Sequence, residues 1–180
     1  MEQNIKRCAV FGQNTICFDW GFDEDDEYCG RMKDMLLQEL VALRQQGVMD
    51  FLVACDHGVG LYAAEIVRAL RADDQTLRLH CVLPHEEQAT KWTPQLRDRY
   101  FAMLGSCTSM DCIAPHEQPD AQFTAFRRII EQSNLVLAVY EANDISRDTK
   151  DKLLAYALEL DRPLMLIHPR TGSAQWVDRG

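Results

Sequence analysis

The amino-acid sequence predicts an α/β fold: a single Rossmann-like domain over residues 1–180, with a doubly wound, mainly parallel sheet of about six strands and helices on both faces. Short apolar runs rich in β-branched or aromatic residues alternate with longer segments of helical period, a pattern typical of parallel strands joined by crossover helices. Because 47% of the residues are hydrophobic, a chain of this length is able to bury a sizeable core.

Six short apolar runs bounded by turn-forming residues are predicted as strands. They cover residues 7–11, 50–54, 77–83, 110–114, 135–140 and 163–167. The fourth run has the weakest strand character.

Five segments are predicted as helices, covering residues 30–46, 60–72, 93–104, 119–132 and 148–160. In the first, apolar residues recur at spacings of three and four, and Gly47 follows as a C-terminal stop. The third opens on Thr93 as an N-cap, with Pro94 at the first helical position.

Charge and composition exclude several classes of partner. A formal net charge of −9 argues against nucleic acid, because phosphate backbones are held mainly by clustered Lys and Arg. Residues 1–7 lack the apolar stretch of a signal peptide, and no apolar run approaches the ~20 residues that span a bilayer. The seven cysteines are expected as reduced thiols, several of them in strand-like runs. We therefore expect a cytoplasmic protein without a nucleic-acid or membrane partner and without disulfides.

A glycine-bearing turn between the second strand and the second helix is the main candidate for a binding site. It contains Gly58 and Gly60, and glycine permits close approach of a ligand to backbone N–H groups at a helix start, which favour anions. Alternatively, the glycines serve only the geometry of a tight turn. The physical argument leaves both interpretations open.

The residues in and after this turn resemble the YpsA-like branch of the SLOG superfamily, which also contains DprA and the Lonely Guy phosphoribohydrolases. The resemblance rests on Gly58-Val59-x-Leu61-x-Ala63-Ala64-Glu65, followed by Pro84, Glu87-Gln88, Trp92 and Tyr100. It extends from the first strand to Pro163 and is strongest over residues 52–100. It implies a Rossmann-like sheet that binds nucleotides or nucleotide-derived ligands on glycine loops after the early strands.

The sequence also departs from the family pattern at several positions. Gln13-Asn14 replaces His-Arg after Gly12, Cys55 replaces a glycine, Gly60 an aspartate, Ala125-Phe126 an Arg-Asn pair, and Asp148-Thr149-Lys150 a Gly-Gly-Thr. Losing these glycines replaces a phosphate cradle with side chains.

The predicted ligand-binding residues lie in loops after the strands, because doubly wound sheets bind ligands at the carboxyl ends of their strands. They are Gly12, Gln13, Asn14, Cys55, Asp56, His57, Gly58, Val59, Gly60, Glu65, Pro84, Trp92, Tyr140 and Glu141. If the protein is an enzyme, Glu65 and Asp56 are the candidate acid and base. A helix-surface role for Glu65, a packing role for Trp92 and a merely polar lining role for His57 are the alternatives.

No metal or other cofactor is predicted. Cys107, Cys112 and His116, with His85, lack the paired Cys-x-x-Cys spacing of structural zinc sites. The acidic run at Asp19 and residues 23–27 lacks the pattern of a calcium loop and is interpreted as a solvated loop or a lid.

The predicted function is therefore binding of a nucleotide or nucleotide-derived small ligand, as in a sensor, with little or no turnover. Two alternatives stay open: a hydrolase of nucleotide N-glycosidic bonds, as the phosphoribohydrolase resemblance suggests, and a non-catalytic protein-interaction module. Assembly into a homo-oligomer is not decided by the sequence.

Overall fold

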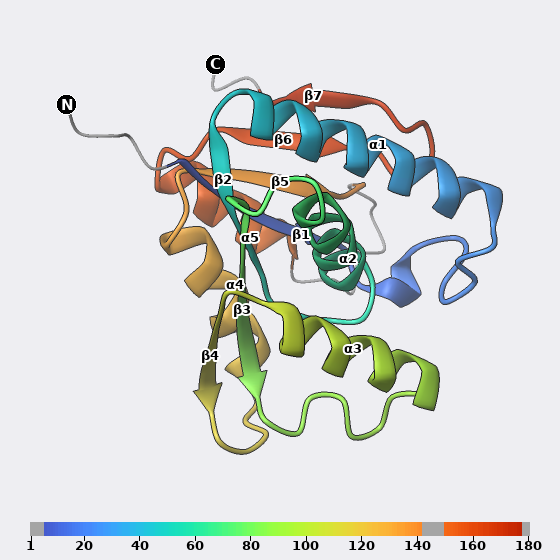
Figure 1. The fold of residues 1–180 in the computed structure, drawn as a ribbon, viewed down its shortest axis with the longest axis vertical. Coiled ribbons are helices and arrows are strands. Elements are labelled where there is room, and N and C mark those ends of the chain that lie inside the picture. The colour runs from blue at the N-terminus through green and yellow to red at the C-terminus, as the bar shows by residue number, and fades with distance from the viewer. Residues whose placement is uncertain (1–5, 142–149, 178–180) are drawn as a thin grey trace.

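The computed structural model describes residues 6–141 and 150–177. Within them, seven strands form one sheet in the order β4-β3-β2-β1-β5-β6-β7 (Figure 1). The strands are β1 (Lys6–Gly12), β2 (Val48–Val53), β3 (Arg78–His85), β4 (Ser109–Ala114), β5 (Leu135–Val139), β6 (Leu164–Ile167) and β7 (Ala174–Trp176). All neighbouring strands run parallel except β6 and β7. This is a Rossmann-like, doubly wound arrangement.

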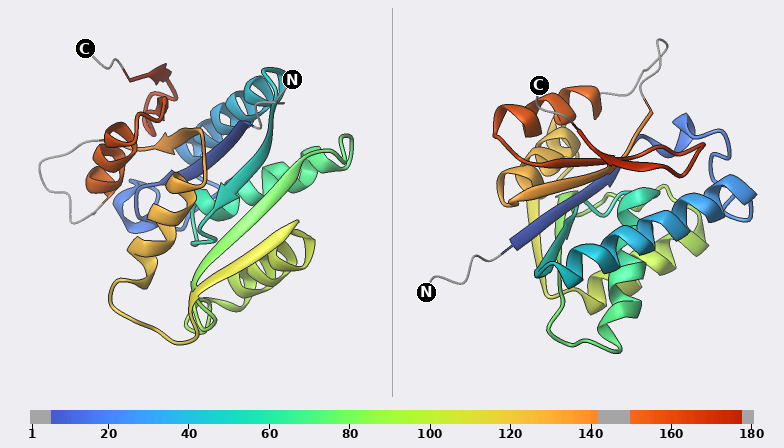
Figure 2. Two further views of the ribbon diagram at one scale, coloured as in Figure 1. Left: turned by 90° about the vertical axis from the view of Figure 1, so that its left-hand side faces the viewer. Right: turned by 90° about the horizontal axis from the view of Figure 1, so that it is seen from above.

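Helices cover both faces of the sheet (Figure 2). They are α1 (Glu27–Gln45), α2 (Val59–Arg71), α3 (Pro94–Ser106), α4 (Ala121–Glu131) and α5 (Lys150–Glu159), with a short 3-10 helix, η1, over Thr15–Cys17. The first three pack on one face and α4 and α5 on the other, because the chain winds outward from β1 to β4 before it returns to the other side of β1.

The core has two layers, because successive side chains of a strand point to opposite faces of the sheet. On β1, Cys8 and Val10 pack with α1, α2 and α3, whereas Ala9 and Phe11 pack with α4 and α5. All four side chains are fully buried, so the central strand is apolar on both faces, as expected for a parallel sheet covered on both sides.

The structure confirms the predicted elements and corrects some of their bounds. Helix α1 begins at Glu27 rather than Gly30, because the Asp26 side chain accepts a hydrogen bond from the Tyr28 N–H and caps it. Helix α4 begins at Ala121 rather than Pro119. The predicted first residues of the last helix, 148 and 149, lie outside the described residues.

The sheet has a seventh strand where about six were predicted. Strand β7 follows a turn at Gly172, whose φ is +67°, and pairs antiparallel with β6. At three residues it is too short to show a periodicity in the sequence.

No helix in the described part of the chain is long and apolar enough to cross a membrane.

Candidate functional site

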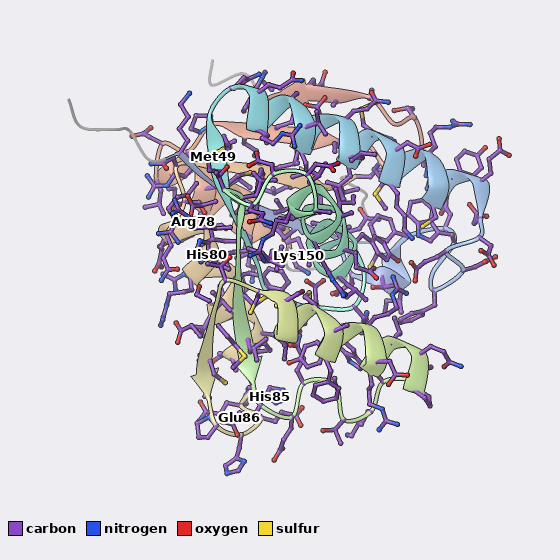
Figure 3. The ribbon with its side chains drawn as sticks, viewed as in Figure 1. Met49, Arg78, His80, His85, Glu86 and Lys150 are labelled. Carbon is purple, nitrogen blue, oxygen red and sulfur yellow. The ribbon has the colours of Figure 1, made fainter. Side chains whose placement is uncertain are left out.

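Three adjoining cavities lie along the edge of the sheet where the parallel strands end. The largest, here called the central cavity, has a volume of about 450 Å³ and lies beyond the ends of β2, β3 and β4. Figure 3 labels His85 at this end of β3, opposite Arg78 and His80. The residues that line the central cavity are Asp56, His57, Pro84, His85, Gln88, Trp92, Glu117, Gln118, Pro119 and Gln122.

Two polar atoms of residues lining the central cavity are buried and have no hydrogen-bond partner among the described residues. They are Nδ1 of His85 and Oε1 of Gln88. A buried polar atom without a partner costs about 1–3 kcal/mol, so a ligand toward which either side chain turns recovers part of this energy. The described lining includes the carboxylates of Asp56 and Glu117 and no Lys or Arg, which disfavours a phosphate here.

A second cavity, here called the lysine cavity, shares Pro119 and Gln122 with the first and has a volume of about 420 Å³. Its other lining residues are Asn14, Asp120, Phe123, Phe126, Lys150 and Lys152. Lys150 is only 3% exposed, and its Nζ lies 4.4 Å from the centre of the Phe126 ring and 3.4 Å from Oδ1 of Asn14. Strand β1 lies between β2 and β5, and the strand order reverses there. The lysine cavity adjoins the end of β1 at this point.

A third cavity, here called the aromatic cavity, shares His57 and Trp92 with the central cavity and has a volume of about 440 Å³. The His57 ring lies 5.0 Å from that of Phe22 and 5.1 Å from that of Trp92, and Trp92 lies 5.1 Å from Tyr100. The Oγ of Thr15 is 2.8 Å from Nδ1 of His57 and holds the imidazole in place. The remaining lining residues are Glu24, Lys91, Thr93, Gln95, Leu96 and Arg99.

The glycines of the α2 turn are required by packing within the protein. Gly58 is the N-cap of α2 at φ +118°, with Oγ1 of Thr15 in the space a side chain would take. A Cβ at Gly60 would meet the carboxylate of Asp56, which is 7% exposed. The buried Asp56 carboxylate packs against the first turn of α2. The favourable field of the helix N-terminus therefore already acts on a protein anion, and a phosphate placed there would be repelled.

The predicted acid or base Glu65 belongs to an ion-pair network. Both of its carboxylate oxygens accept hydrogen bonds from Arg99 of α3, at 2.6 and 3.2 Å. Arg99 also donates to Glu24, at 2.6 and 2.9 Å. The two carboxylates raise the pKa of Arg99 further above its ordinary value, so the guanidinium is always charged.

The other predicted residues lie at the same edge of the sheet, in three settings. Asp56, His57, Pro84 and Trp92 line the central cavity, and Asn14 lines the lysine cavity. Gly12, Cys55, Val59, Gly60 and Tyr140 are packed beneath the surface.

Gln13 and Glu141 join the ends of β1 and β5. The side chain of Gln13 donates to the carbonyl of Cys17 and accepts from the backbone N–H of Glu141, both at 3.0 Å. The Glu141 carboxylate pairs with Arg170 at 3.0 Å and lies 3.6 Å from His168. These side chains therefore support the loop that carries Asn14.

The predicted ligand-binding residues did not include His85, Gln88, Lys150 or residues 117–122, which contribute to the central and lysine cavities. His85 is the last residue of β3 and Gln88 lies in the loop after it, so the strand-end rule that selected Pro84 covers both of them. Residues 117–122 span the loop after β4 and the start of α4. The edge strand β4 is mostly exposed, and its weak apolar pattern gave no reason to examine the residues that follow it. Lys150 was considered only as part of Asp148-Thr149-Lys150, and its burial was not predicted because it depends on packing against Phe126.

Among the described residues, no three His, Cys, Asp or Glu side chains lie close enough together to hold a metal ion. All seven cysteines are free thiols.

Comparison with known proteins assigns the family. A family model named YpsA, the YspA SLOG family, matches residues 11–171. A UPF0398 protein of Bacillus pumilus is 28% identical over 169 residues, which are 91% of this chain and 88% of the relative. A UPF0398 protein of Bacillus licheniformis is 28% identical over 141 residues, 76% of this chain and 75% of the relative. The chain therefore belongs to the YpsA family of SLOG proteins.

Proposed function

We propose that this protein binds a nucleotide or nucleotide-derived small molecule along the carboxyl edge of its sheet, acts as a sensor of that ligand and turns it over slowly or not at all. The observation that carries the proposal is the central cavity, with its two buried polar atoms that have no partner and its aromatic wall.

The lining of the central cavity suits a heterocyclic base. The amide oxygen of Gln88 accepts a hydrogen bond, and Nδ1 of His85 donates or accepts according to its tautomer. The rings of His57 and Trp92 offer apolar surface beside these groups. A planar base with an amino group on its edge satisfies Gln88 and contacts the rings.

The charged part of the ligand belongs in the lysine cavity. Lys150 and Lys152 line it beside a single aspartate, Asp120, and it adjoins the central cavity at Pro119 and Gln122. One ligand with a base at one end and a phosphate at the other therefore reaches both cavities. In this arrangement the base, not the phosphate, lies nearest the start of α2.

Binding is tested by titrating the purified protein with AMP, GMP, CMP, UMP and a nucleoside diphosphate sugar in a calorimeter. Native mass spectrometry of freshly purified protein tests in parallel for a retained molecule. We expect at least one of these compounds to bind, and Gln88→Leu to weaken that binding about tenfold, since a hydrogen bond contributes about 1 kcal/mol and an unmet buried donor on the ligand costs more.

The matched control is Gln75→Leu, the same change at an exposed position in the loop before β3. It should leave affinity unchanged. Absence of binding across the panel together with absence of a retained molecule would overturn the proposal, as would equal affinity in wild type and Gln88→Leu.

A further inference from the structure

The acidic loop, residues 19–26, passes over the aromatic cavity and is anchored at both ends. At its start, the buried rings of Phe18 and Trp20 stack 4.6 Å apart. At its end, Asp26 caps α1. Between them Gly21 has φ +57° and open space around it, which places a conformationally permissive residue directly after the buried anchor.

The middle of the loop touches the site with little apolar burial. The Phe22 ring lies 5.0 Å from that of His57, yet Phe22 remains 52% exposed. Phe22 and Glu24 form one wall of the aromatic cavity. Because opening of this segment exposes little buried apolar surface, apolar contact contributes little to the stability of its closed position.

Charge holds the segment in place. The Glu24 carboxylate accepts two hydrogen bonds from Arg99 and one of 2.6 Å from Lys33. Lys33 belongs to α1, and Arg99 belongs to α3 and is fixed from its other side by Glu65 of α2. Glu24 therefore ties the loop to two helices through a single side chain, here called the Glu24 latch.

We propose that the acidic loop is a lid over the aromatic cavity, which shares His57 and Trp92 with the central cavity, and that the Glu24 latch holds it closed. Opening breaks the three hydrogen bonds to Glu24 while the anchor at Phe18 and Trp20 stays in place, and Gly21 takes up the change in backbone direction. The side chains of Glu24, Arg99 and Lys33 are 23–31% exposed, so water replaces part of the lost interaction and the open state is within thermal reach. The lid regulates access to the central cavity from the side of the aromatic cavity, and this inference rests on the proposed function for its ligand.

The lid is tested without any ligand by hydrogen–deuterium exchange of the purified full chain. We expect Glu24→Gln to speed exchange of the amides at residues 21–26 about tenfold, because charge-assisted hydrogen bonds are the strong ones and the amide replaces a carboxylate. Lys33→Gln, which removes one of the two partners, should speed it about threefold. The matched control is Glu27→Gln, whose carboxylate is 87% exposed and 3.9 Å from Arg31; it should stay within about twofold of wild type.

The result that overturns the lid is unchanged exchange at residues 21–26 in both Glu24→Gln and Lys33→Gln, or the same increase in Glu27→Gln. A uniform increase in amide exchange over β1, β2 and β5 in Glu24→Gln would mark global unfolding. In that case the exchange at residues 21–26 in Lys33→Gln tests the lid. The two proposals fail in different measurements. If neither AMP nor the rest of the panel binds, the proposed function fails, whereas the exchange result tests only the loop. If AMP binds, Glu24→Gln should raise its association and dissociation rates together.

Discussion

At the scale of single residues, Asp50 shows how the end of the sheet remote from the site is stabilised. Its carboxylate on β2 accepts two hydrogen bonds from Arg78, at 2.8 and 3.0 Å, and lies 2.8 Å from Nε2 of His80. The other ring nitrogen of His80 is 2.6 Å from the hydroxyl of Ser109. Figure 3 places Arg78 and His80 at the opposite end of β3 from His85. The network therefore joins β2, β3 and β4 without reaching the cavities.

This network predicts an acid-sensitive contribution to stability. Burial acts to raise the pKa of Asp50, but Arg78 and His80 together outweigh it and hold the pKa below its ordinary value of 3.8. Because the pKa is lower in the folded chain than in the unfolded one, the contribution is complete above pH 3.8 and is lost as the pH falls through the folded value.

We expect Asp50→Asn to lower the free energy of unfolding by about 1.5–3 kcal/mol at pH 7, as for hydrogen bonds to a charged group. Urea unfolding at several pH values measures the difference between wild type and variant, which should shrink below about pH 4. A difference that stays constant from pH 7 to pH 2.5 would show that charge at Asp50 is not involved.

The same scale shows why the site was only partly predictable from sequence. Cys55, where the family resemblance suggests glycine, has φ +62° and is fully buried, so the turn keeps the backbone that glycine favours without glycine. Glu65 was selected for its position in the helix, but its orientation depends on Arg99, 34 residues further along the chain. The position of a residue after a strand predicts which loop carries its side chain. The residues that this side chain contacts are set by tertiary packing and are not predicted.

At the scale of elements, local signals predicted the positions of helices and strands better than their ends. Thr93 and Pro94 begin α3 as predicted, and the Thr93 side chain accepts from the N–H of Leu96. For α1 the acidic residues were assigned to the loop, although Asp26 caps the helix. Strand β7 was missed because a three-residue strand is specified by its pairing with β6 and not by a pattern of its own.

The close packing of α2 against β1 gives a second prediction. Gly12 ends β1 without a left-handed backbone, but a Cβ there would lie 2.8 Å from Cβ of Val59 and 3.1 Å from the carbonyl oxygen of Val139. We expect Gly12→Ala to lower the free energy of unfolding by about 1–3 kcal/mol through overpacking. Because the first obstacle is Val59, the double variant Gly12→Ala/Val59→Ala should lose less stability than the sum of the two single variants.

Chemical denaturation of the four proteins in this double-mutant cycle measures the coupling between the two positions. A coupling energy near zero would mean that Val139 or a backbone shift, not Val59, sets the distance between α2 and β1.

At the scale of the whole molecule, the alternation of apolar strands and helices was enough to predict the doubly wound sheet, and the three cavities lie at the edge where the candidate site was expected. Parallel strands and short connections leave few topologies, and the described parts of the predicted strand-end loops lie at one edge. The distribution of charge along that edge was not predictable. It places carboxylates beside the start of α2 and lysines beside the reversal of strand order, because it depends on which loops adjoin in space.

This distribution bears on catalysis. Cleavage of an N-glycosidic bond requires a carboxylate near the anomeric carbon to act as acid, base or nucleophile. Glu65 is absent from the described lining of all three cavities, and both of its oxygens are bonded to Arg99. Asp56 does line the central cavity, but it is 7% exposed and packs against Gly60.

We therefore expect release of free base from AMP, GMP, CMP and UMP to be near the rate without protein, and equal in wild type and in Glu65→Gln. Chromatographic detection of the base after prolonged incubation measures this. General acid or base catalysis typically contributes about 10²–10⁴-fold to a rate. Turnover by wild type that falls about a hundredfold in Glu65→Gln, with Glu27→Gln unaffected, would therefore assign Glu65 a catalytic role and replace the sensor by a hydrolase. If activity falls in Asp56→Asn instead, the reacting carbon lies in the central cavity, and the ligand is oriented as proposed but is cleaved.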